Sequence, residues 1–95
     1  MQQITIFSES VTALKPLLES AIQTELRLIG LGIERTQQKL VDFERQYEMM
    51  SGEFEALLDT GEIDENLDYI EWSGEIETLR RLQAKYQTLQ RAQLS

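Results

Sequence analysis

Closely spaced carboxylates are the most distinctive chemical groups of this sequence. Eleven of its seventeen acidic side chains lie between Gln46 and Leu79, a stretch without any Lys or Arg. These eleven are Glu48, Glu53, Glu55, Asp59, Glu62, Asp64, Glu65, Asp68, Glu71, Glu75 and Glu77. Such groups can bind a divalent cation, act as a general acid and base, or attract a cationic macromolecule. Each of these uses places different demands on the neighbouring residues.

Part of the acidic block has the spacing of a calcium-binding loop. Four side chains match positions 1, 3, 5 and 12 of the EF-hand pattern, namely Asp64, Asn66, Asp68 and Glu75. Position 6 of that pattern requires glycine for a sharp turn, but this sequence has Tyr69 there, and the residues that follow have a helical pattern. We therefore expect Asp64 or Asn66 to cap a helix, and we predict no metal site.

Catalysis by paired carboxylates is not expected either. Glu71 and Glu75 would share one helix face, but the chain contains no histidine and no cysteine. These absences exclude the commonest general base, thiolate nucleophiles, disulfides and the usual zinc sites. The sequence also lacks a phosphate-binding glycine loop and the Glu-x-x-His pair of carboxylate metal centres. We expect a protein that is not an enzyme and that uses no cofactor.

A third use of the carboxylates is to bind a basic protein. This use fits the aromatic and other apolar side chains that the block also contains. Apolar anchors surrounded by acids capture basic partners through electrostatic steering. A lone tryptophan at a heptad position is more often a core residue than an anchor, so Trp72 has two interpretations. The predicted partner-binding residues are Tyr47, Met49, Phe54, Glu55, Leu58, Asp59, Glu62, Asp68, Tyr69 and Trp72.

Composition limits the other partners. The net charge of −8 repels nucleic-acid phosphates and anionic lipids, so we expect no direct nucleic-acid or membrane contact. No apolar stretch reaches the roughly 18 residues of a membrane span, and the first residues lack a signal-peptide pattern. We expect a cytoplasmic protein. Its 95 residues form one domain with a small core, which favours oligomerisation.

A long helix is predicted before the acidic block. Pro16 suits the first turn of a helix, so we predict a helix over residues 16–48, after an N-terminal segment (1–15) with a possible short strand near Ile4. Side chains at alternating steps of four and three form a heptad seam: Ile22, Leu26, Ile29, Ile33, Thr36, Leu40, Phe43 and Tyr47. Further apolar residues widen this face and indicate a bundle: Leu17, Ala21, Leu28, Leu31 and Val41.

Two further helices complete the predicted fold. Ser51 is expected to cap a short helix over residues 51–60, and Gly61 is expected to end it. A C-terminal helix over residues 65–92 supplies the second seam: Leu79, Leu82, Tyr86 and Leu89. Gly30 and Gly32 indicate either close packing of another helix or a kink. We predict an all-α, elongated helical hairpin of two long helices joined by a short helix and turn, dimerising into a four-helix arrangement.

Eleven residues across about thirty positions form a pattern that resembles small acidic helical antitoxins of bacterial and archaeal toxin–antitoxin pairs. The residues are Phe43, Tyr47, Met49, Phe54, Leu58, Gly61, Glu62, Ile63, Asp68, Glu71 and Trp72. One departure is Glu48, where the pattern has glycine at a helix break. The resemblance implies neutralisation of a basic, RNA-directed toxin encoded by an adjacent gene. The alternative is a structural or assembly hairpin whose acidic surface only provides solubility.

Overall fold

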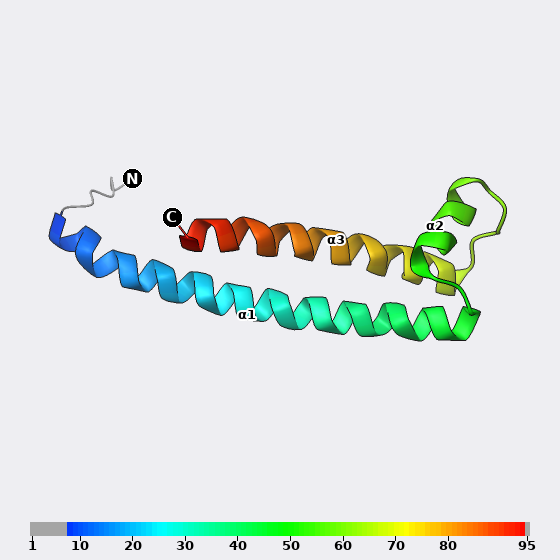
Figure 1. The fold of residues 1–95 in the computed structure, drawn as a ribbon, viewed down its shortest axis with the longest axis horizontal. Helices are drawn as coiled ribbons and strands as arrows, with labels where there is room; N and C mark the ends of the chain where they lie inside the picture. Colours follow the sequence, from blue (N-terminus) through cyan, green and yellow to red (C-terminus); the bar gives the residue numbers. More distant parts are fainter. Residues whose placement is uncertain (1–7, 95) are drawn as a thin grey trace.

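The chain forms an elongated helical hairpin (Figure 1). The computed structural model describes residues 8–94, which form α1 (Ser8–Tyr47), α2 (Ser51–Asp59) and α3 (Leu67–Leu94). α1 and α3 lie side by side in antiparallel orientation, and α2 lies at their connected end. The radius of gyration is 19.7 Å, against about 12 Å for a compact domain of this length. The prediction of an all-α hairpin is confirmed.

α1 begins earlier than predicted. The expected start was Pro16, but the helix begins at Ser8, so Pro16 lies inside it. An interior proline removes one backbone hydrogen bond and clashes with the preceding turn, which bends a helix without always ending it. The first turns of α1 are indeed bent away from the rest (Figure 1). The bounds 16–48 are therefore corrected to Ser8–Tyr47, and the strand predicted near Ile4 lies outside the described residues.

The predicted seams face one another. All twelve of their side chains are buried or half-buried: Ile22, Leu26, Ile29, Ile33, Thr36, Leu40, Phe43, Tyr47, Leu79, Leu82, Tyr86 and Leu89. A Cβ atom on Gly32 would lie 3.3 Å from Leu82 Cδ1, and one on Gly30 would lie 3.8 Å from Tyr86 Cε2. The glycines therefore permit close approach of α3, while α1 continues through them without a break.

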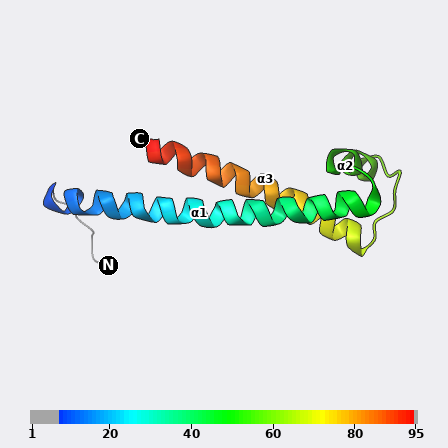
Figure 2. The ribbon, with the colours of Figure 1, turned by 60° about the horizontal axis from the view of Figure 1, so that its bottom comes forward.

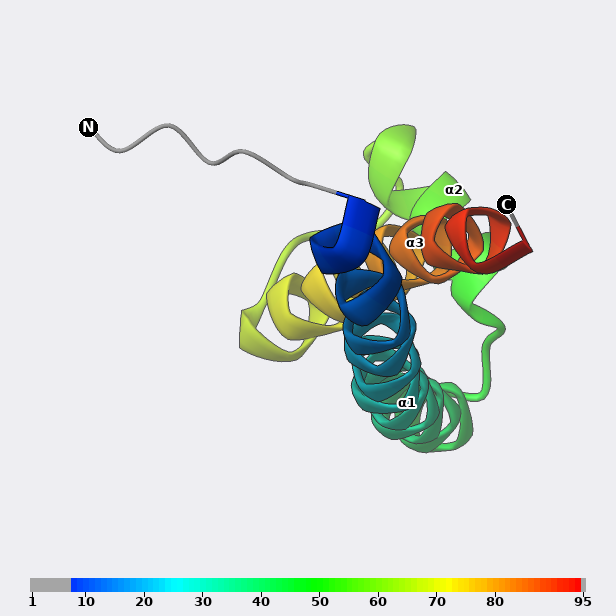
Figure 3. The ribbon, with the colours of Figure 1, turned by 90° about the vertical axis from the view of Figure 1, so that its left-hand side faces the viewer.

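α3 crosses α1 at a slant instead of following it along its full length. Its first turns lie on one side of α1 and its last turns on the other (Figures 2 and 3). The N-terminal part of α1 also extends beyond the end of α3 (Figure 1). Leu17 and Leu18 in that part remain 67% and 53% exposed.

The end of α1 is formed by a residue in an unusual conformation. Glu48 has φ +52°, the left-handed conformation that glycine adopts most easily. The Met49 N–H donates to the Glu44 carbonyl over 3.1 Å, the six-to-one hydrogen bond of a Schellman motif. The helix therefore breaks after Tyr47, although Glu48 stands where a glycine would be favoured.

The ends of the other two helices follow capping rules with one correction. Gly61, with φ +75°, terminates α2 as predicted. Asn66, and not Asp64, caps α3, because its Oδ1 accepts the Tyr69 N–H at 2.8 Å. Ser51 was predicted to be the N-cap of α2, but Met50 has that position, and Ser51 is the first helical residue. Its hydroxyl instead binds residues of the two long helices.

Candidate protein-interaction surface

A stack of three aromatic rings holds the connected end of the hairpin together. Trp72 of α3 lies between Phe54 of α2 and Phe43 of α1, with ring centroids 3.9 and 5.5 Å away and planes within 10° of parallel. Tyr69 meets Phe54 edge-on at 5.2 Å. Trp72 and Phe54 are 0% exposed. Such ring pairs stabilise a fold by about 0.5–1.5 kcal/mol each beyond their buried area, so this stack anchors α2 on the hairpin.

A polar network connects the same three helices beside the stack. The Trp72 Nε1–H donates to Ser51 Oγ at 2.9 Å. The Ser51 hydroxyl and backbone N–H both donate to Glu44 Oε2, at 2.8 and 3.0 Å. The Glu44 carboxylate therefore accepts a free N–H at the start of α2 and complements the positive end of that helix.

A second polar contact joins the end of α1 to the start of α3. The Tyr47 hydroxyl donates a short hydrogen bond to Asp68, which also accepts from Gln46 Nε2 at 3.4 Å. Because this bond stabilises the protonated phenol, and partial burial and the negative charge of Asp68 act in the same direction, the pKa of Tyr47 rises to about 12. Asp68 therefore has a structural partner within the chain.

Three of the eleven block carboxylates form ion pairs with cations outside the block. Arg80 binds Glu55 across α2 and α3, with Nη1 2.9 Å from Glu55 Oε2, and this hydrogen bond raises the pKa of the guanidinium. Lys39 Nζ lies 3.2 Å from Glu75. Glu77 lies 3.9 Å from both Arg80 and Arg81. These three carboxylates pair with cations of the chain itself. Their negative charge is therefore less available to an external partner.

Seven other carboxylates of the block remain exposed. Within the described part of the chain, no Lys or Arg nitrogen lies within 4 Å of any of them. We call this group the acidic tip: Glu48, Glu53, Asp59, Glu62, Asp64, Glu65 and Glu71. Its members surround the connected end of the hairpin, on α2, on both connecting segments and on the first turns of α3 (Figure 1).

The ten predicted partner-binding residues fall into distinct environments. Phe54 and Trp72 have no exposed surface, so of the two interpretations of Trp72 the structure favours the core residue, and Phe54 belongs to the same core. Four others are half-buried around that core: Tyr47, Met49, Leu58 and Tyr69. Glu55 and Asp68 bind residues of the chain itself. Of the ten, only Asp59 and Glu62 are exposed.

Sequence reasoning missed several residues that build this end of the molecule. Ile76 lies on the seam side of α3, as its spacing predicted, and is buried in the core cluster, but the packing of Ile63 against that cluster was not predicted. The roles of Glu44 and Ser51 had no sequence signal, because their contact depends on how α2 folds back onto α1. The apolar character of Ile63, the one apolar residue between Gly61 and Asn66, was the one available indication of its burial.

Other classes of site find little support in the structure. No group of acidic side chains within residues 8–94 is arranged to hold a metal ion. Over the same residues, each helix is too short or too polar to span a bilayer. Comparison with family models, curated proteins and solved structures found no match for this chain. The functional inference therefore rests on the chemistry of its own residues.

Proposed function

We propose that this chain is a cytoplasmic, non-catalytic protein-binding module whose acidic tip binds a basic protein. The most concrete form is an antitoxin that covers the basic surface of a toxin encoded beside it. The observation that carries the proposal is the acidic tip itself, in which none of the seven exposed carboxylates forms an ion pair within 4 Å among the described residues. Like charges held together repel one another, and a cationic partner would relieve that repulsion.

The packing and hydrogen bonds at the connected end support the same proposal. Folding there depends on the aromatic stack and on the Ser51 network, neither of which requires the acidic tip. The carboxylates are therefore available for a partner without loss of the core. A negative surface of this kind accelerates encounter with a basic protein, and the acceleration weakens as salt increases.

A structural or assembly role is the second candidate. The exposed leucines of α1, among them Leu17 and Leu28, favour it, since they are 67% and 55% exposed. In that case the acidic tip would only maintain solubility. The two functions differ in what they require of the tip, because removing its charge would impair an antitoxin and leave assembly unchanged.

Co-expression tests the antitoxin proposal. The tagged chain is produced together with the product of the small basic reading frame expected beside its gene, and both are purified through the tag. We expect stoichiometric copurification and relief of the growth inhibition that the product causes alone. A locus without such a reading frame, or a product that does not copurify, would contradict the antitoxin form of the proposal.

A further inference from the structure

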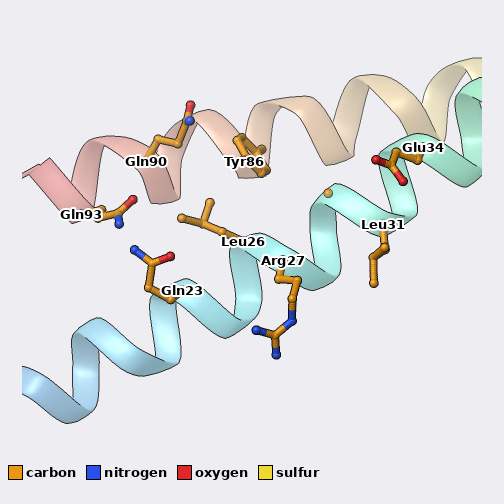
Figure 4. Close-up of a pocket in the computed structure, with 9 residues that line it drawn as sticks. Gln23, Leu26, Arg27, Leu31, Glu34, Tyr86, Gln90 and Gln93 are labelled. Atoms are coloured by element: carbon orange, nitrogen blue, oxygen red, sulfur yellow. The ribbon is translucent and has the colours of Figure 1, made fainter.

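A second row of side chains runs along α1 outside its contact with α3. Its members recur at steps of three and four, so all lie on one face of the helix: Leu14, Leu17, Ala21, Thr24, Leu28 and Leu31. We call this row the outer seam. Leu17, Leu28 and Leu31 are 67%, 55% and 52% exposed. Figure 4 shows Leu31 pointing away from α3, whereas Leu26 of the first seam points toward it.

We propose that the outer seam is the interface with a second copy of this chain, packed antiparallel to the first. An antiparallel alignment centred between Ile22 and Gln23 makes the row complementary to itself. Facing positions across this interface pair leucine with leucine near both ends and small residues in the middle: Leu14 with Leu31, Leu17 with Leu28, and Ala21 with Thr24. The same face serves both copies, so the assembly closes as a two-fold dimer.

A groove next to the outer seam can accommodate part of the second copy. It has a volume of about 440 Å³ and lies between α1 and α3, lined by Glu25, Ile29, Ala84, Lys85, Thr88 and Leu89. Leu18, 53% exposed, and Glu25 are one heptad apart, on the flank of the outer seam that faces α3. In the antiparallel alignment, Leu18 of one copy lies next to Glu25 of the other copy. Leu18 of the second copy therefore enters this groove and contacts Ile29 and Leu89.

The opposite flank is less suited to an apolar helix. The groove there, of about 490 Å³, is bordered by polar side chains that include Gln23, Arg27, Glu34 and Gln90 (Figure 4). Burying these groups without partners would cost free energy. The second copy therefore contacts the outer seam and the more apolar groove beside it.

The charge distribution favours a second copy in this orientation. Residues 13–35 contain three acidic and three basic side chains and carry no net charge: Lys15, Glu19, Glu25, Arg27, Glu34 and Arg35. The acidic tip lies at the other end of α1. Antiparallel packing separates the two tips, each about 37 Å from the centre at 1.5 Å per residue, well beyond a Debye length of about 8 Å. Parallel packing would bring the tips together.

Sedimentation of a single variant tests the interface. We expect the unmodified chain to be a dimer at micromolar concentration and Leu28→Asp to be a monomer with unchanged helix content, because Leu28 is 55% exposed in the single chain. Gln37→Asp, which introduces the same negative charge at an exposed position of α1 outside the outer seam, should remain a dimer. A monomeric unmodified chain, or a dimeric Leu28→Asp variant, would overturn the proposal.

Introduced cysteines test the orientation, since the chain has none of its own. Under mild oxidation, a mixture of Leu17→Cys and Leu28→Cys chains should form the mixed disulfide dimer, and neither variant alone should crosslink efficiently. Efficient crosslinking of Leu17→Cys alone would indicate parallel packing and overturn the antiparallel alignment. The dimer does not depend on the acidic tip, so either proposal can fail without the other.

Discussion

Trp72 and Ser51 form a hydrogen bond of 2.9 Å, from the indole Nε1–H to the hydroxyl oxygen, which joins α3 to α2 beneath the acidic tip. Trp72 is fully buried, so its N–H has no access to water in the folded chain. Ser51 also donates to Glu44 of α1, so one hydroxyl connects all three helices. The position of α2, and with it the carboxylates that α2 carries, depends on this residue.

Ser51→Ala should lower the free energy of unfolding by about 1–3 kcal/mol, because it leaves the buried indole N–H without an acceptor. Urea denaturation followed by circular dichroism measures the change. Ser20→Ala is the matched control, since Ser20 is exposed on α1. Equal stabilities of the two variants would show that the hydrogen bond does not hold α2 in place.

Glu48→Gly should stabilise the chain. The left-handed conformation is unfavourable for an L residue by roughly 1–2 kcal/mol, and the greater freedom of glycine in the unfolded state cancels part of the gain, so we expect an increase of about 0.5–1 kcal/mol. Thermal and urea denaturation measure it. Glu48→Ala removes the same charge but keeps Cβ, and it should give no such increase. If alanine stabilises as much as glycine, charge and not backbone conformation is responsible.

Tyr47 should make stability depend on pH in the alkaline range. Its pKa is about 12 in the folded chain, against an ordinary value of 10.0. A raised folded pKa means that its contribution is fully present below pH 10 and is lost as the pH rises toward 12. Tyrosinate absorbance should show the late titration of Tyr47, and Asp68→Asn should return it toward the ordinary range. A late titration that persists in Asp68→Asn would contradict the assigned cause.

The two long helices could be predicted because their seams repeat with a helical period. Leu26, Ile29 and Leu40 are buried where that spacing places them. The start of α1 could not be predicted in the same way, since one proline near a helix end is compatible both with a first turn and with a bend. At Glu48, local preference favours glycine, yet this residue takes the left-handed conformation and the helix ends with the Met49 N–H bound to the Glu44 carbonyl.

The candidate surface was only partly predictable. Periodicity indicates that Phe54 and Trp72 are buried, but it does not indicate whether their own chain or a partner covers them. In the structure α2 folds back onto the hairpin and places Phe54 directly on Trp72. Residues of the same chain therefore cover these two rings. The acidic character of the surface was predictable, because charged side chains remain exposed unless a partner within the chain is within reach.

Association kinetics test whether the acidic tip captures a basic protein. The triple variant Glu53→Gln, Glu62→Gln and Glu65→Gln removes three tip charges, and Glu19→Gln, Glu34→Gln with Asp42→Asn removes three exposed charges along α1 as a matched control. Both are mixed with the neighbouring gene's basic product in a stopped-flow instrument at low and high salt. We predict that the tip variant associates at least about tenfold more slowly at low salt, with a weaker salt dependence, and that the control resembles the unmodified chain. Equal association rates for all three chains at low salt would contradict the proposed role of the tip.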